Sequence, residues 1–191
     1  MVLASQRGRL VDGIAAAVAE KGYPATRVAD VVGRAGVSRK TFYEHFEDKL
    51  DCFLAAYDIG VEVLLAELQA AWDRPGTFPE RLEAAVDAYL GTLADAPDFA
   101  RTFLIEALAA GPRALERRAY VHRRFAAQME AAHGETSLPE PPPQAYAAAV
   151  GAVNELVAER VRQGRIDSLP ELAGTVRAIQ IRLLSGPGGC A

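Results

Sequence analysis

Apolar residues recur at intervals of three and four along most of the chain, the spacing that places them on one face of a helix. Leu10, Ile14 and Val18 form the first such stripe. Glycines, prolines and N-capping side chains separate the periodic segments, and no segment shows the alternation of a strand. The sequence therefore predicts an all-α protein of about nine helices. They span residues 5–21, 27–35, 39–46, 49–72, 80–94, 97–109, 112–132, 144–163 and 170–185.

These helices are predicted to form two domains and a tail. Residues 1–48 hold three short helices, and residues 49–185 hold the remaining, mostly longer ones. A proline-rich loop over residues 134–143 interrupts the second domain. The last segment, residues 186–191, contains three glycines and a proline and is predicted to be a flexible tail.

Residues 26–49 carry the pattern of a helix-turn-helix. Two short helices flank a tight turn at residues 35–37, and each is predicted to begin after a hydroxyl N-cap, Thr26 or Ser38. The second helix fits the major groove of DNA, where its first side chains reach the base edges. Its outer surface carries hydrogen-bonding side chains. They are Arg39, Lys40, Thr41, Tyr43 and His45.

The charge distribution supports this interpretation. The net charge of the whole chain is −4, but residues 1–46 hold seven Lys or Arg against four acidic residues, so this segment carries +3 and the rest −7. A basic end on an acidic protein is the asymmetry expected when that end contacts phosphate. The alternative is a small helical bundle whose second short helix is simply solvated.

The same segment resembles the DNA-binding region of TetR-family transcriptional regulators, over roughly residues 8–57. The resemblance rests on motifs at fixed spacing. They are Gly22-Tyr23, Ala25-Thr26, Ala35-Gly36-Val37-Ser38, Thr41-Phe42-Tyr43-Glu44-His45-Phe46 and Asp48-Lys49. One departure is Lys40, where many members have glycine.

The resemblance implies a ligand-responsive repressor that binds a palindromic operator in double-stranded DNA as a homodimer. The starts of the second and fourth helices would contact phosphate, and the third helix would contact bases and the backbone. The DNA-contacting residues implied are Thr26, Arg27, Ser38, Arg39, Lys40, Thr41, Tyr43, His45 and Lys49. The alternative function is a helical ligand-binding or adaptor protein that does not bind DNA.

The last two predicted helices are apolar on two sides, so both sides need a packing partner. The resemblance implies that they form a four-helix dimer interface, whereas the alternative is that they close the core of the single chain. The interface residues expected are Val150, Val153, Val157, Val161, Val176, Ile179 and Leu183.

The resemblance also implies a pocket for a small-molecule effector among the helices between residues 49 and 132. Its expected lining residues are aromatic or flexible, and the alternative, which the residues themselves favour, is that each is plain core. They are Trp72, Tyr89, Phe99, Phe103, Phe125 and Met129.

No enzyme, metal or cofactor is expected. The three histidines have no cysteine or carboxylate at metal-binding spacing, and the sequence contains no phosphate loop, GxSxG or GxGxxG motif. Cys52 and Cys190 form no CxxC pair, and Cys52 is predicted to be a small core residue. No apolar run is long enough to span a membrane and no signal peptide is recognised, so a cytoplasmic location is expected.

Overall fold

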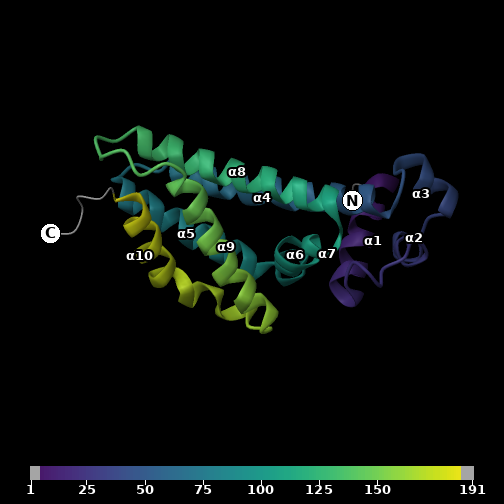
Figure 1. Cartoon of the computed structure of the whole chain (residues 1–191). Coiled ribbons are helices and arrows are strands. Elements are labelled where there is room, and N and C mark those ends of the chain that lie inside the picture. Colours follow the sequence, from purple (N-terminus) through teal and green to yellow (C-terminus); the bar gives the residue numbers. More distant parts are fainter. Residues whose placement is uncertain (1–4, 186–191) are drawn as a thin grey trace. The chain divides into compact units, whose positions relative to one another are not determined.

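A computed structural model describes residues 5–185, and within this range the predicted all-α fold is confirmed, with no strand (Figure 1). The helices begin and end close to the predicted residues. They are α1 (Gln6–Lys21), α2 (Val28–Ala35), α3 (Arg39–His45), α4 (Lys49–Trp72), α5 (Phe78–Asp95), α6 (Pro97–Arg101), η1 (Thr102–Glu106), α7 (Ala107–Ala109), α8 (Pro112–Gly134), α9 (Ala145–Arg162), η2 (Ile166–Leu172) and α10 (Ala173–Leu184). The tail predicted at 186–191 lies outside the described residues.

The chain divides into two compact units. The first comprises residues 5–62 with 98–118, and the second comprises residues 63–97 with 119–185. The long helices α4 and α8 therefore contribute residues to both units. The boundaries of these compact units differ from the predicted domain boundary after residue 48. The reason is that the start of α4 and the segment from α6 to α7 pack with α1 to α3. As a division of functions, the boundary after residue 48 stays a prediction.

Local capping explains why the helices of the first unit begin and end where they do. The Ser38 Oγ accepts a hydrogen bond from the Thr41 N–H at 3.0 Å, which is the predicted N-cap of α3. Gly36, with a φ of 62°, ends α2 in the left-handed conformation. The Asp48 carboxylate accepts from the Asp51 N–H at 2.7 Å and caps α4. The sequence-based placement of the helix-turn-helix is confirmed at these three points.

The predicted N-cap of α2 is wrong. Helix α2 begins at Val28, and its N-cap residue is Arg27, whose N–H donates to the Asp30 carboxylate at 2.8 Å. The Thr26 hydroxyl instead donates to the carbonyl oxygens of Ala17 and Gly22, at 3.2 and 2.8 Å. Thr26 is only 2% exposed, so its side chain belongs to the interior beneath the connection between α1 and α2.

The segment predicted as one helix over 97–109 contains a π-helical stretch, η1, between the short helices α6 and α7. Within the first unit, the Phe103 ring of η1 stacks on Tyr57 of α4 at 5.5 Å between centroids. At the end of η1, the carboxylate of Glu106 accepts a hydrogen bond from the backbone N–H of Tyr23 at 2.7 Å. The π-helical stretch thus brings an aromatic ring against α4 and a carboxylate against the connection between α1 and α2.

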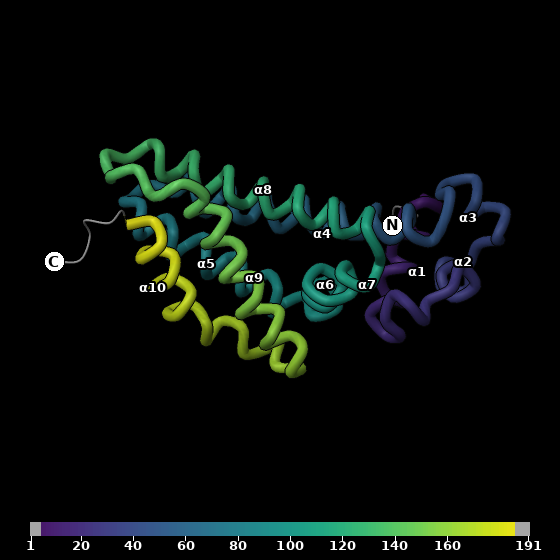
Figure 2. Tube along the Cα trace, viewed as in Figure 1, coloured from purple at the N-terminus to yellow at the C-terminus, as the bar shows by residue number. Residues whose placement is uncertain are grey.

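In the second unit, α5 packs against η2 and α10, and α9 packs against both of the same elements (Figure 2). The helix predicted over 170–185 is divided there, because a 3₁₀ segment precedes α10 and contains Pro170, which has no N–H to donate. Arg81 of α5 joins the ends of two further helices. Its guanidinium donates to the Trp72 carbonyl at 3.4 Å and to the Ala132 carbonyl at 2.8 Å.

Candidate DNA-binding surface and ligand cavity

Helix α3 presents the predicted polar surface to solvent. Its inner face is fixed by Phe42, which is fully buried, and by Phe46 just after it, with ring centroids 5.8 Å apart. On the opposite side, Arg39 is exposed and Tyr43 is 53% exposed. Lys40 and His45 are exposed as well, whereas Thr41 is half-buried beside Ser38. A helix this short depends on its packed face for stability. Here that packing leaves the opposite face of α3 exposed, so that it could enter a groove of DNA.

The cations around α3 differ in how far they are already paired. Lys21 contacts Asp30 at 2.6 Å, and its hydrogen bond holds the pKa of that carboxyl below its ordinary value. Lys40 lies 3.9 Å from Glu44, and at that distance an exposed pair contributes little. Arg27 and Arg39 are exposed at the starts of α2 and α3. These two arginines and Lys40 are therefore the cations placed to meet an anionic partner.

Two of the predicted phosphate-contacting residues are engaged inside the protein. The Lys49 ammonium donates to the carbonyl oxygens of Tyr23 and Thr26, both at 2.8 Å, and lies 4.0 Å from the Tyr23 ring centroid. Burial lowers the pKa of Lys49. Because the Thr26 hydroxyl also donates internally, both side chains hold the connection between α1 and α2, and their contact with DNA stays a prediction.

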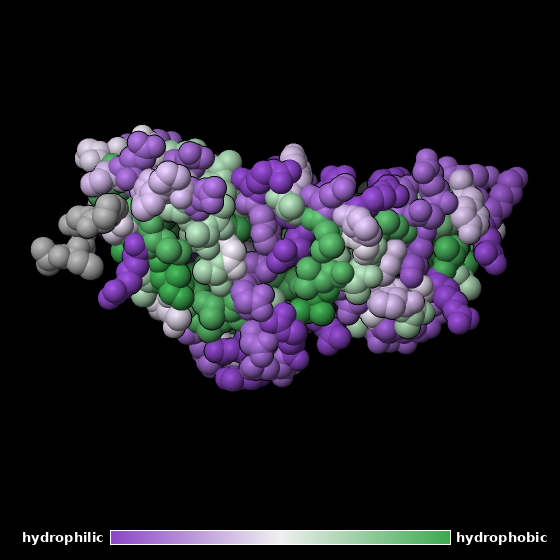
Figure 3. Space-filling view, in the orientation of Figure 1, coloured by the Kyte–Doolittle hydropathy of each residue, from purple (hydrophilic) through white to green (hydrophobic). Residues whose placement is uncertain are grey.

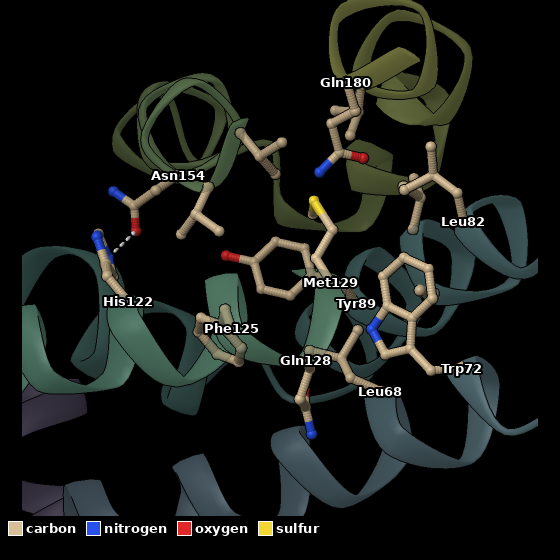
Figure 4. A pocket seen from close by; sticks show the side chains of 15 residues that line it. Leu68, Trp72, Leu82, Tyr89, His122, Phe125, Gln128, Met129, Asn154 and Gln180 are labelled. Carbon is tan, nitrogen blue, oxygen red and sulfur yellow. Dashed lines mark hydrogen bonds between the residues drawn. The ribbon is translucent and has the colours of Figure 1, made fainter. Parts of the chain in front are cut away.

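A cavity of about 60 Å³ lies within the second unit, between α4, α5, α8, α9 and α10 (Figure 4). Four of the six predicted effector-binding residues line it, namely Trp72, Tyr89, Phe125 and Met129. The other lining residues are mostly aliphatic. They are Leu68, Leu82, Ala85, Val86, His122, Gln128, Val150, Val153, Asn154, Val176 and Gln180.

The remaining two predicted effector residues, Phe99 and Phe103, do not line this cavity. Both belong to the first unit, where Phe103 is 1% exposed and stacks on Tyr57. The Phe99 ring fills the space over Gly60, where an added Cβ atom would collide with it. Phe103 is a core residue, which was the alternative that the sequence left open, and Phe99 is half-buried beside it.

Sequence reasoning missed the polar residues of the cavity. His122 of α8 and Asn154 of α9 form a hydrogen bond of 3.2 Å. Gln128 of α8 donates to the Leu65 carbonyl oxygen at 3.1 Å. A signal existed for Asn154 and Gln180, because each interrupts an otherwise apolar buried stripe of its helix. Amides in such positions are costly unless they have a partner.

The residues predicted for the dimer interface are largely used within the single chain. The five valines among them are 0–7% exposed, and Ile179 and Leu183 are half-buried. The valine faces of α9 and α10 therefore close the core of the second unit. The sides of the two helices left open carry mostly small and apolar residues, and Figure 3 shows an apolar area over them. These exposed residues include Ala147, Ala148, Gly151, Ala178 and Ile181.

In residues 5–185, no group of three or more His, Cys, Asp or Glu side chains is arranged to hold a metal ion. None of the helices in this range is both long and apolar enough to cross a membrane.

Comparison with known proteins supports the resemblance at the N-terminus. A family model described as bacterial regulatory proteins, tetR family, matches residues 10–56. The transcriptional activator FasR of Mycolicibacterium smegmatis is 32% identical over 84 residues, which are 44% of this chain and 38% of FasR. The matched segment thus spans well under half the length of that relative.

Two solved structures share the fold over nearly the whole chain. The fatty acid degradation regulator FadR from Bacillus halodurans has a TM-score of 0.81 at 16% identity, covering 99% of this chain and 98% of that one. FadR from Bacillus subtilis, solved in complex with stearoyl-CoA, has a TM-score of 0.79 at 17% identity, covering 91% and 96%.

An N-terminal helix-turn-helix followed by a set of longer helices places the chain among the all-α helix-turn-helix proteins. Residues 10–56 thus match the TetR family of bacterial regulatory proteins, and the chain shares its overall fold with the two FadR structures.

Proposed function

We propose that this protein is a transcriptional regulator that binds a palindromic DNA operator as a homodimer and is released from it by a small-molecule effector. The observation that carries the proposal is the outer surface of α3. Arg39, Lys40 and Tyr43 stand exposed there on a helix whose opposite face is anchored by Phe42 and Phe46. A rigid helix with exposed donors at its N-terminal end suits reading of the major groove.

Dimer formation is supported by the open sides of α9 and α10. Residues such as Gly151 and Ala178 let a second pair of helices approach closely, and Ile181 remains 43% exposed without a partner copy. A two-fold contact of this kind is self-complementary, so it matches the symmetry of a palindromic site. The two recognition helices would then enter major grooves about 34 Å apart, or a multiple of that distance.

Effector binding is supported by the cavity of the second unit. Its lining is apolar apart from a few amide, imidazole and hydroxyl groups, as expected for a site that binds a small molecule. The stearoyl-CoA held by the FadR structure of B. subtilis is consistent with an effector that has an apolar portion. Such an effector changes DNA affinity only if it binds the two states of the regulator with different affinities.

DNA binding is tested with purified full-length protein by selecting duplexes from a random library and measuring affinity for the selected and a scrambled duplex. The selected sequences should contain two inverted half-sites. Arg39→Ala should reduce the ratio of the two affinities by about 10–100-fold if Arg39 contacts a base in bidentate fashion. Arg74→Ala, an exposed arginine in the loop after α4, is the control and should leave the ratio unchanged.

Selection of no sequence would favour the alternative of an adaptor protein that does not bind DNA. An equal loss of affinity for both duplexes in Arg39→Ala would instead assign this arginine to phosphate, which sets affinity without sequence preference.

The dimer is tested by sedimentation of Gly151→Arg. No atom lies within 4 Å of a Cβ added at Gly151, so the variant should fold as a single chain but sediment as a monomer. Ala131→Arg, exposed on α8, is the control and should remain dimeric. A dimeric Gly151→Arg protein would show that another surface joins the two copies.

A further inference from the structure

Helix α10 carries one amide on its buried face. Gln180 lies between Val176 and Leu184, one helical turn away on either side, and the three residues are 5%, 1% and 4% exposed. A leucine at position 180 would continue this apolar stripe without the cost of burying an amide. The packing of α10 therefore does not explain why a glutamine occupies position 180.

Gln180 lines the cavity, and its amide nitrogen lies next to Met129, whereas its oxygen points to the other side (Figure 4). Its Oε1 atom is buried and has no hydrogen-bond partner among the described residues. A buried acceptor without a partner destabilises the folded protein. The Oε1 atom of Gln128, the other glutamine of the lining, is also buried without a partner, but the Gln128 amide points toward α4, where its nitrogen donates to the Leu65 carbonyl oxygen. Of the two glutamines, Gln180 is therefore the one whose amide lies at the cavity rather than against α4.

The rest of the lining restricts what could pair with this amide. None of the 15 lining residues is Lys, Arg, Asp or Glu, so a charged ligand group would lose its hydration without gaining an opposite charge. The cavity of about 60 Å³ has room for about four water molecules. A larger ligand requires side chains to move, and the unbranched Met129 is well suited to do so.

We propose that the cavity binds an uncharged, mainly apolar molecule with one hydroxyl group, and that this hydroxyl donates its hydrogen bond to Oε1 of Gln180. Gln180 is then the residue that orients the ligand and selects a polar neutral compound over an apolar or anionic one of the same size. This inference rests on one part of the proposed function, namely that the cavity is the effector site. It does not depend on DNA binding.

Binding can be followed through Trp72, which lines the cavity and is the single tryptophan of the chain. Three probes of similar length are titrated against the full-length protein without DNA: 1-hexanol, 1-methoxypentane and hexanoate. The alcohol supplies an O–H donor, the ether lacks it, and the carboxylate adds a charge. We expect 1-hexanol to bind about fivefold more tightly than the ether, as one neutral hydrogen bond allows. Hexanoate should bind about tenfold more weakly than the alcohol, or worse.

The variant Gln180→Met keeps the length of the side chain and removes its hydrogen-bonding groups. It should bind the alcohol and the ether equally, and continued binding of the ether would show that the cavity is intact. Gln163→Met, an exposed glutamine after α9, is the control and should keep the preference for the alcohol. If Gln180→Met does not fold, the comparison of alcohol and ether in the unaltered protein still tests the inference.

Equal binding of the alcohol and the ether by the unaltered protein would overturn the role of Gln180. Tightest binding of hexanoate, or no binding of any probe, would overturn the proposed class of ligand. Because these titrations contain no DNA, they are independent of the test of DNA binding, and either proposal can fail alone.

Discussion

The hydrogen bond between Glu106 and the Tyr23 backbone joins residues 83 positions apart, and its loss should measurably destabilise the protein. The Glu106 carboxylate is 8% exposed, and the distance of 2.7 Å from its Oε2 to the Tyr23 nitrogen is typical of a charge-assisted bond. Glu106→Ala leaves a buried N–H without its acceptor, which costs about 1–3 kcal/mol, and also removes packed methylene groups. We therefore expect the free energy of unfolding to fall by about 2–4 kcal/mol.

Glu106→Gln separates the contribution of the charge from that of the acceptor. The amide oxygen can still accept from the Tyr23 N–H, so the loss should be only about 1 kcal/mol, the difference between a charge-assisted and a neutral hydrogen bond. Both values are obtained from urea unfolding followed by circular dichroism. Glu116→Ala, an exposed glutamate of α8 in the same unit, serves as the control and should change stability by less than about 0.5 kcal/mol. The reasoning fails if Glu106→Ala is as stable as the unaltered protein, or if Gln is as damaging as Ala.

Three further substitutions test other parts of the first unit. Gly13→Ala places a Cβ atom 2.9 Å from the Val31 carbonyl oxygen, so urea unfolding should show a loss of about 1–3 kcal/mol despite the better helix propensity of alanine. Burial raises the pKa of Cys52 from 9.0 to about 12, so folding favours the thiol, and stability should decline as the pH rises from about 9 toward 12. Cys52→Ala should decline less steeply over that range, whereas identical pH profiles would contradict the assignment. Lys49→Ala should reduce stability by about 1–2 kcal/mol, because its ammonium donates to two backbone carbonyls, including that of Tyr23. It should leave the salt dependence of DNA affinity unchanged, and a slope reduced by about one would show that Lys49 contacts phosphate after all.

The sequence alone determined where most helices of this protein lie and which side of α3 faces solvent. Ser38, Gly36 and Asp48 mark where helices begin or end through bonds to residues at most four positions away, so the local sequence contains all that is needed. The spacing of Phe42 and Phe46 likewise fixes which side of α3 is buried, and hence which side faces solvent.

Tertiary structure decided which partner each buried or polar side chain meets. Periodicity identifies a buried face but not the element packed against it, which is why Phe103 contacts α4 in the first unit while Phe125 lines the cavity of the second. The same limit applies to Val157, which was predicted at a dimer interface and is fully buried within the single chain. Lys49 and Gln180 illustrate this for polar groups. Only the fold brings two carbonyl oxygens to the Lys49 ammonium and leaves the Gln180 side-chain oxygen buried without a partner. Such contacts join residues far apart in the chain, and no local pattern encodes them.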